Sequence, residues 1–306
     1  MKRVLVTGAT GFTGPKLVRA LRERGDRVIA YVRDAAKAAA LLGKDVDVVV
    51  DLDEVPSTAT IDAVVNLAGA PIAGGLWTAR RRALLLDSRL GVTRALLGLC
   101  ARLETKSATW INASAIGYYG ARAGDELVDE TAPAGTGFQA ELCRRWEETA
   151  AQAAAHGAHV SALRFGVVLG RDGGALPQYA LPIRLYAGTV LGSGRQWLSW
   201  IHIDDLLQLL LFVLDRRTLT GAVNATAPEP VRNADFNAML AATLKRPLWP
   251  VRIPAPLVRA ALGELAELFV DGQRVVPKRA LELTFRFEYP ELSGALSHLL
   301  AARTRS

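Results

Sequence analysis

A glycine-rich turn, VLVTGATGFTG at residues 4–14, follows directly on an apolar run at the start of this chain. Gly8, Gly11 and Gly14 are spaced by three, and a helical pattern begins near residue 12. In such a turn the first glycine permits the tight bend, the second lets the backbone approach a pyrophosphate, and the third lets the helix pack on the strand. The helix then directs its N–H groups and positive dipole end at the phosphates. The pattern predicts a dinucleotide-binding βαβ unit.

Apolar runs alternate with helical patterns through the first two-thirds of the chain. The runs are continuous in Val, Ile and Leu, as expected for a parallel sheet covered on both faces. We therefore predict an α/β fold, a Rossmann-type doubly wound parallel sheet. The predicted strands are 3–7, 27–32, 47–50, 63–68, 109–114 and 160–169, and the predicted helices are 12–24, 35–42, 78–103 and 138–155.

From about Arg171 onward Gly and Pro become frequent and the segments between them become shorter. This change predicts a smaller C-terminal substrate lobe. The run WIHIDDLLQLLLFVLD, residues 200–215, interrupts it, and its strand and helix are expected to return to the sheet. We assign residues 1–170 and 197–226 to the dinucleotide-binding domain. Residues 171–196 and 227–306 are assigned to the substrate-binding lobe.

Composition narrows the class of protein. The 306 residues are 50% hydrophobic and 22% charged, typical of a globular protein, and no secretory leader opens the chain. The longest apolar run, Leu206 to Leu214, is too short to span a bilayer. Cys100 and Cys143 have neither disulfide-framework nor metal-ligand spacing. We therefore expect a cytoplasmic monomer or homodimer without a metal site or a membrane partner.

The net charge of +7 raises nucleic acid as a partner. The densest basic run is Arg80 to Arg82, and a solvated helix face explains it. No nucleic-acid-binding motif accompanies it, so no nucleic-acid partner is expected.

The choice of dinucleotide depends on the end of the second predicted strand. An NAD site places a carboxylate there for the ribose hydroxyls. Here the strand ends in Val32 and Arg33, and a guanidinium suits a 2′-phosphate. Asp34 competes for the role, but it precedes a helical run and is well placed to cap it. NADP(H) is the predicted cofactor, with a solvated loop position as the alternative for Arg33.

Further motifs make the chain resemble an extended short-chain dehydrogenase/reductase of the epimerase branch. They are NLAG at 66–69, Ser114, RFGVVLG at 164–170 and WIHIDDL at 200–206. More narrowly, SAIGYYG, CRRWEE, LGSGRQWLSWIHIDDL and DGQRVVPKRAL resemble an atypical epimerase-like subfamily that is described as NADP-dependent oxidoreductases or cell-division inhibitors. The resemblance implies that Ser114 is the catalytic serine. It implies cofactor contacts from Gly8, Thr10, Gly11, Phe12, Gly14, Arg33, Leu67, Ala68, Gly69, Arg89 and Val167.

The proton-relay dyad of that family is absent. The family places a tyrosine, followed four residues later by a lysine, on the helix after the serine. Here Phe138 and Leu142 occupy those positions, and no Lys occurs between Lys106 and Lys245. Tyr118 is the candidate substitute, followed at the same interval by Arg122, whose charge could lower the pKa of the phenol. Packing is the alternative for Tyr118 and for the neighbouring Tyr119.

The substrate side also departs from the family. Leu198 stands where nucleotide-sugar enzymes have an arginine, with Trp197 and Trp200 around it and Arg195 as a possible replacement. This favours a smaller apolar or aromatic carbonyl substrate. Arg89 stands where the branch has an asparagine, and a salt bridge to Asp87 or Glu104 is its alternative role.

Two functions remain open. The first is an NADP(H)-dependent oxidoreductase with an altered active site, acting on a small carbonyl or hydroxyl substrate. The second is a non-catalytic NADP(H)-sensing regulatory protein.

Overall fold

A computed structural model of the chain describes residues 1–122 and 124–301. Its centre is a sheet of seven parallel strands in the order β12-β7-β5-β4-β1-β2-β3. The strands are β1 (Arg3–Thr7), β2 (Arg27–Tyr31), β3 (Asp47–Val49), β4 (Ala63–Asn66), β5 (Thr109–Ala115), β7 (His159–Phe165) and β12 (Gly221–Ala225). The doubly wound α/β prediction is confirmed.

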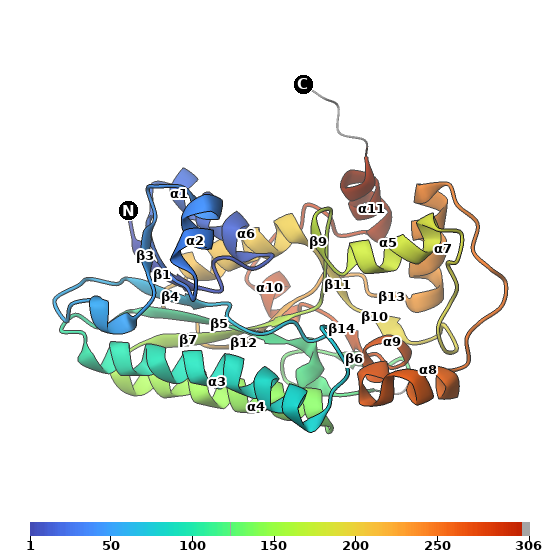
Figure 1. Cartoon of the computed structure of the whole chain (residues 1–306), viewed down its shortest axis with the longest axis horizontal. Coiled ribbons are helices and arrows are strands. Elements are labelled where there is room, and N and C mark those ends of the chain that lie inside the picture. Colours follow the sequence, from blue (N-terminus) through green and yellow to red (C-terminus); the bar gives the residue numbers. More distant parts are fainter. Residues whose placement is uncertain (123, 302–306) are drawn as a thin grey trace.

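Helices cover both faces of the sheet (Figure 1). One face carries α1 (Gly14–Glu23), α2 (Ala35–Leu42) and α6 (Ile203–Asp215), and the other carries α3 (Ala79–Arg102) and α4 (Phe138–Ala151). The alternation of side chains along each strand assigns the faces. Val4 and Val6 pack toward α1 and α6, whereas Leu5 between them packs toward α3. Both faces are therefore apolar, which explains the continuous Val, Ile and Leu runs.

The single strand predicted at 160–169 is two strands. β7 ends at Phe165, and β8 (Val167–Gly170) joins a separate sheet with β11 (Trp200–His202) and β9 (Gly173–Gly174). Between them, the N–H of Gly166 bonds to Ala225 and that of Val167 bonds to Ser199. A Cβ on Gly166 would lie 2.7 Å from the Ser199 carbonyl oxygen, so the change of partner requires glycine.

The expected return of residues 200–215 to the sheet is half correct. Helix α6 packs on the central sheet, but β11 pairs with β8 outside it. Helix α4 is also shorter than predicted, because a 3₁₀ turn, η3 (Gln152–His156), follows it.

The C-terminal segments gather at one end of the sheet, beyond the carboxyl ends of its central strands (Figure 1). They are α5 (Leu176–Arg184), α7 (Asn233–Leu244), α8 (Ala255–Leu262) and α9 (Glu267–Val270), with the short pair β10 (Trp197–Leu198) and β13 (Val231–Arg232). Helix α11 (Leu292–Leu300) packs on α7, and α10 (Lys278–Glu282) packs beside β12 at the edge of the central sheet. Strand β14 (Arg274–Val275) pairs with β6 (Leu127–Val128), which follows β5 in the chain. The 3₁₀ turns η1 (Leu52–Glu54), η2 (Ile116–Tyr119) and η4 (Gly263–Ala266) complete the elements. The domain boundaries given above stay a prediction. None of the described helices is both long and apolar enough to cross a membrane.

Candidate functional site

The strand order creates a crevice between β1 and β4. From β1 the chain proceeds to β2 and β3 on one side, and from β4 to β5, β7 and β12 on the other. In open α/β sheets such a switch point, at the carboxyl ends of the strands, is where ligands bind. The glycine-rich turn after β1 and the residues after β4 both border it.

The glycine turn has the predicted backbone. Gly8 has a φ of +65°, and a Cβ there would lie 2.6 Å from the Leu67 carbonyl oxygen. A Cβ on Gly14 would lie 2.2 Å from the Gly8 carbonyl oxygen. Helix α1 begins at Gly14, and its N-cap, Thr13, makes no side-chain capping bond. Apart from Pro15, which has no N–H, the first residues of α1 therefore keep their N–H groups available to an anion, as a pyrophosphate requires.

Phe12 is turned away from that role. Its ring packs on the β8–β9 hairpin, where a Cβ on Gly170 or on Gly173 would lie 2.4 Å from it. The backbone of Phe12 remains in the turn. Phe12 can therefore make its predicted cofactor contact only through its main chain.

Arg33 and Asp34 take different roles at the end of β2. The Asp34 carboxylate accepts the Lys37 N–H at 2.9 Å and caps α2, as the sequence predicted. Arg33 is exposed and makes no hydrogen bond or ion pair with the described residues. Because β2 neighbours β1, Arg33 follows a strand that ends next to the strand leading into the glycine turn. The Asp34 carboxylate, which could mark an NAD site, is used as a helix cap, whereas the Arg33 guanidinium is available to bind a phosphate.

Arg89 closes the crevice next to Leu67, Ala68 and Gly69. The Ala68 N–H donates to the Thr7 hydroxyl at 3.2 Å, which holds this loop. The Arg89 guanidinium donates to the carbonyls of Leu85 and Ala70, at 3.0 and 3.2 Å. A Cβ on Gly69 would lie 2.9 Å from its Cζ.

The alternative role of Arg89 does not occur, because the guanidinium pairs with neither Asp87 nor Glu104. It lies 5.1 Å above the Trp146 ring, and burial lowers its pKa. A half-buried cation therefore borders the crevice.

Ser114 is part of a buried polar network. Its hydroxyl donates to Glu147 Oε1 at 2.6 Å. Glu147 accepts two bonds from the Arg164 guanidinium, at 2.9 and 2.8 Å. Arg164 also donates to the Tyr119 hydroxyl at 2.9 Å, and Tyr119 donates to Asn224 at 2.7 Å. Burial raises the pKa of Tyr119 to about 12, although Arg164 acts to lower it. These groups satisfy one another, which is the requirement for burying them.

Tyr118 lies beside the same network. The Arg164 guanidinium stacks 3.4 Å from its ring centre. Arg122 turns instead to the carbonyls of Tyr119 and Pro133. Residues 116–119 form the 3₁₀ turn η2, which ends before Arg122, so the helical interval predicted to join Tyr118 and Arg122 does not apply. The catalytic roles of Ser114 and Tyr118 stay predictions, and neither residue lines the cavities described below.

Phe138 and Leu142, the positions of the missing dyad, are core residues. Phe138 is the first residue of α4, and its ring meets Trp77 edge-on at 5.3 Å. Leu142 is 3% exposed and packs with Trp77, Leu85 and Leu265. The next residue, Cys143, is also buried, and burial raises the pKa of its thiol to about 11. Leu142 and Cys143 on α4 are therefore shielded from water.

An inner cavity of about 100 Å³ opens where β5, β7 and β8 meet the C-terminal segments. Its walls include Ile116 and Gly117 after β5, Gln139 on α4, and Val167, which is one of the predicted cofactor residues. From the C-terminal side come Tyr179 on α5 and three polar residues, Gln196, Glu267 and Gln273. This is the point where a dinucleotide crossing the crevice from Arg33 would end, because β5 and β7 lie on the far side of β1 and β4.

The glutamines of the inner cavity are held in place. Gln273 donates to the Ile116 carbonyl at 2.8 Å, and Gln139 donates to Glu267 at 3.5 Å. Gln196 donates to the carbonyls of Leu191 and Phe269, each at 2.8 Å, while its Oε1 is buried without a partner among the described residues. Sequence reasoning missed these residues. Gln196 and Gln273 do lie within two of the motifs that carried the resemblance, which was the available signal.

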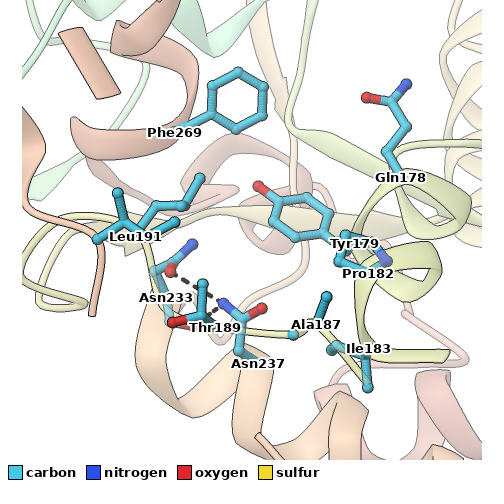
Figure 2. Close-up of a pocket in the computed structure, with 12 residues that line it drawn as sticks. Gln178, Tyr179, Pro182, Ile183, Ala187, Thr189, Leu191, Asn233, Asn237 and Phe269 are labelled. Carbon is cyan, nitrogen blue, oxygen red and sulfur yellow. Dashed lines mark hydrogen bonds between the residues drawn. The ribbon is translucent and has the colours of Figure 1, made fainter. Parts of the chain in front are cut away.

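Tyr179 is the phenol that reaches this cavity. It was not selected from the sequence, because nothing in ALPQYALP distinguishes it from a packing residue. Its hydroxyl points into open space in Figure 2 and makes no hydrogen bond with the described residues. Burial raises its pKa to about 12, so the phenol keeps its proton at neutral pH.

The two tryptophans predicted to surround the substrate lie in different environments. Trp197 lines the inner cavity, but Trp200 is fully buried and bonds to the Glu229 carbonyl at 3.0 Å. The expectation for Trp200 is therefore wrong, because the strand that carries it is covered on both sides. Arg195 is exposed and lines a surface cavity of about 470 Å³ together with Arg232.

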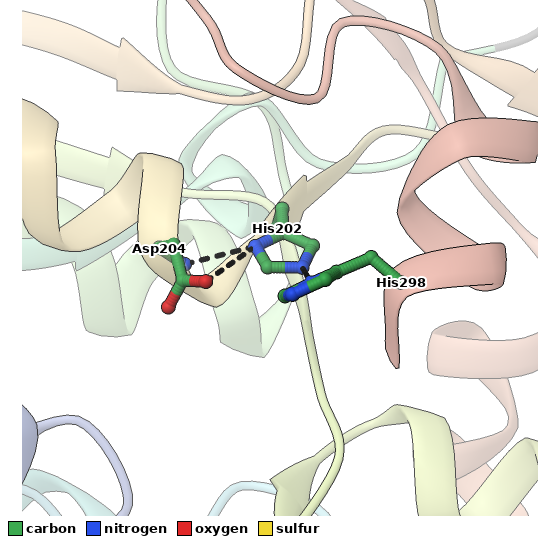
Figure 3. A group of neighbouring side chains, drawn as sticks. All are labelled: His202, Asp204 and His298. Carbon is green, nitrogen blue, oxygen red and sulfur yellow. Dashed lines mark hydrogen bonds and ion pairs between the residues drawn. The ribbon is translucent and has the colours of Figure 1, made fainter. Parts of the chain in front are cut away.

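A second polar group joins His202, Asp204 and His298 (Figure 3). His202 Nδ1 accepts the Asp204 N–H at 3.0 Å, so neutral His202 carries its proton on Nε2. It then donates to His298 Nδ1 at 3.1 Å. The Asp204 carboxylate lies beside the Nδ1 edge, at 3.7 Å, while His298 lies at the Nε2 edge. Because these groups occupy opposite edges of one ring, we interpret them as a link from α11 to the start of α6.

Comparison with known proteins shows which family the chain belongs to. A family model described as "NAD dependent epimerase/dehydratase family" matches residues 4–225, and "Domain of unknown function (DUF1731)" matches residues 253–299. The chain is 38% identical to "Epimerase family protein SDR39U1 homolog, chloroplastic" of Arabidopsis thaliana, over 97% of this chain and 86% of that protein. It is 36% identical to "Epimerase family protein YfhF" of Bacillus subtilis, over 98% of each.

A solved structure is similar over the same length. The crystal structure of human epimerase family protein SDR39U1 (isoform 2) with NADPH matches at 32% identity and a TM-score of 0.85. The match covers 97% of this chain and 98% of the human chain.

Proposed function

Because the chain belongs to the NAD dependent epimerase/dehydratase family, we propose that it binds NADP(H) and acts as an oxidoreductase on a small carbonyl or hydroxyl compound. The choice of NADP(H) over NAD(H) rests on the different roles of Arg33 and Asp34 at the end of β2. Asp34 is used as a helix cap, whereas Arg33 is exposed beside the glycine turn. The NADPH bound by the human relative supports this choice.

NADPH, when bound, supplies the hydride. The uncapped start of α1 would hold the pyrophosphate, and Arg33 would hold the 2′-phosphate. Val167 and Ile116 would then border the nicotinamide end, because they follow β7 and β5 on the far side of the crevice. The inner cavity is therefore the place for the reacting carbonyl.

Tyr179 is the proton donor in this proposal. Its phenol is protonated at neutral pH, and the oxygen of a reduced carbonyl, an alkoxide, is basic enough to take that proton even from a phenol whose pKa burial raises to about 12. As hydride reaches the carbonyl carbon, the Tyr179 proton passes to the carbonyl oxygen and leaves an alcohol. The phenolate regains its proton from water through the open cavity. Gln139 and Gln273 line the same space and orient the substrate by hydrogen bonds.

A scan of aldehydes and ketones with NADPH, followed at the nicotinamide absorbance, tests the activity. We expect Tyr179→Phe to lower kcat about 100-fold or more, the usual effect of losing a general acid, with NADPH affinity unchanged. Tyr118→Phe tests the other candidate phenol and should change kcat less than about twofold if Tyr179 is the donor, because Tyr118 lies outside the cavity. Equal losses in both variants would remove Tyr179 from the mechanism.

A second function, an NADP(H) sensor without catalysis, is favoured by the residues that α4 carries at the two positions of the family dyad. The positions of the family dyad carry the half-buried Phe138 and the buried Leu142, and the Ser114 hydroxyl is bonded to Glu147. A chain that binds NADPH with micromolar or tighter affinity, yet reduces no carbonyl in the scan, would have this function.

A further inference from the structure

The inner cavity continues to the surface through two further spaces. An apolar cavity of about 310 Å³ adjoins it and shares Tyr179, Asn233 and Phe269 with its wall. An outer groove of about 310 Å³ adjoins the apolar cavity in turn and shares Ala187, Thr189 and Ile253 with it. The three spaces therefore adjoin one another through common wall residues, whereas on another side the inner cavity shares Gln196 and Trp197 with the charged surface cavity of Arg195 and Arg232. We call these three spaces together the passage.

The walls of the passage outside the inner cavity carry no charged side chain among the described residues. The apolar cavity is walled by Pro182, Ile183, Leu191, Ile253 and Phe269 (Figure 2). Such walls offer no cation to a diphosphate, so this part of the site does not suit a nucleotide sugar. They suit an uncharged chain.

The polar atoms of the apolar cavity are few and largely engaged. The Asn237 amide donates to the Asn233 backbone carbonyl at 2.8 Å and to its side-chain oxygen at 3.0 Å. The Tyr179 hydroxyl, by contrast, has no partner among residues 1–122 and 124–301, and Tyr179 belongs to the walls of both the apolar cavity and the inner cavity. A single oxygen on the ligand at this junction would satisfy it.

The outer groove exposes large apolar side chains to solvent. Tyr186, Trp249 and Val251 are 55%, 60% and 67% exposed. They are nonetheless ordered by bonds, because the Trp249 indole donates to the Tyr186 carbonyl at 2.6 Å and its N–H donates to Gly188 at 2.9 Å. Tyr186 also has a φ of +58°, because it lies in the left-handed cap that ends α5, where the N–H of Ala187 bonds to the Pro182 carbonyl.

We propose that the passage binds a medium-length, uncharged alkyl or aryl chain, whose oxygen-bearing end lies at Tyr179 and whose tail leaves through the outer groove. This inference rests on the proposed function and names its substrate class: hydrophobic aldehydes and ketones and the matching alcohols. The shared walls set the orientation. The reacting end goes inward because Tyr179 and Val167 lie there, and the tail goes outward because the walls of that path are mostly apolar and carry no charged side chain among the described residues.

Binding of straight-chain alcohols to the protein with NADPH bound tests the inference separately from turnover, because an alcohol and NADPH are both reduced and cannot react. Calorimetric titration would use 1-butanol, 1-hexanol, 1-octanol and 1-decanol. We expect the affinity to rise about two- to fourfold with each methylene that enters the passage. An affinity that does not change with chain length would overturn the proposal.

Two variants locate the tail. Ala187→Phe narrows the junction of the apolar cavity and the outer groove, and Val251→Asp places a charge at the groove. Each should weaken 1-decanol at least tenfold and leave 1-butanol and NADPH unchanged. Leu281→Asp, at a position 47% exposed on α10 and outside these cavities, is the matched control and should have no effect. Unchanged 1-decanol binding in both passage variants would contradict the proposal.

The remaining outcomes separate the two proposals. If 1-decanol binds as expected but decanal is not reduced, the passage stands and the oxidoreductase function fails. If decanal is reduced but affinity does not depend on chain length, the function stands and the passage fails. A protein that is dimeric by light scattering, becomes monomeric as Val251→Asp and keeps its 1-decanol affinity would show that the outer groove is an interface between copies, and the passage would again fail.

Discussion

Ser114 donates its hydroxyl hydrogen to Glu147 at 2.6 Å, and Glu147 in turn neutralises Arg164 in the interior between β5, β7 and α4. The side chains of Arg164 and Glu147 are only 5% and 14% exposed. The serine that the resemblance marks as catalytic is thus one member of a buried network that extends to Tyr119 and Asn224.

Removing Glu147 tests this network. Glu147→Ala leaves the Arg164 charge buried and unpaired, and we expect the free energy of unfolding to fall by about 3–5 kcal/mol. Ser114→Ala should cost about 1–3 kcal/mol, since it leaves Glu147 one bond short. Glu148→Ala, on the exposed side of the same helix, should stay within about 0.5 kcal/mol. Urea unfolding gives all three values, and a Glu147→Ala loss no larger than that of Glu148→Ala would refute the role of the network.

Arg33 should set the preference for NADPH over NADH. One charge-assisted pair with the 2′-phosphate contributes about 1.5–3 kcal/mol, so NADPH should bind at least about tenfold tighter than NADH. Arg33→Ala should remove most of that ratio by weakening NADPH alone. Arg19→Ala, on the exposed side of α1, is the control. Calorimetric titration of both cofactors decides the matter, and equal wild-type affinities would exclude Arg33.

Restoring the family dyad should fail. Phe138→Tyr with Leu142→Lys places an ammonium in the apolar cluster of Trp77, Leu85 and Leu265, at a position 3% exposed. We expect Leu142→Lys to lower the free energy of unfolding by several kcal/mol, roughly 3 or more. Ala151→Lys, exposed at the end of the same helix, should be nearly neutral. Melting temperatures with and without NADPH provide the measurement, and a stable double variant that NADPH stabilises more strongly would show that position 142 is wet and near the cofactor.

His202 should make the protein less stable in mild acid. Burial lowers the pKa of His202 from its ordinary 6.5 to about 4, so the unfolded chain binds a proton between these values that the folded chain does not. The contribution of neutral His202 to the free energy of unfolding is complete above about pH 6.5 and is lost as the pH falls toward 4. At pH 5 the free energy of unfolding should be lower by about 2 kcal/mol. His202→Asn keeps an acceptor for the Asp204 N–H and should flatten this dependence. Urea unfolding at pH 7 and pH 5 measures it, with the exposed His159→Asn as control, and equal slopes in wild type and His202→Asn would contradict the assignment.

The sequence by itself determined the sheet and its cofactor turn, because both depend on local patterns. Continuous Val, Ile and Leu runs give strands buried on both faces, and spaced glycines permit a bend that a Cβ would block, as the close approach of Gly14 to the Gly8 carbonyl shows. The Asp34 cap is equally local, since its acceptor and donor lie three residues apart. These contacts form between neighbours in the chain, and a linear pattern records them.

The tertiary structure alone decided which polar groups meet the cavity. Ser114 and Tyr118 were expected there, but Glu147 and Arg164, distant in the chain, bind or cover them. Tyr179 was unmarked in the sequence, and the packing of α5 brings it beside Val167. Whether a hydroxyl is satisfied or available depends on partners tens of residues away, and no spacing along the chain encodes that distance in space.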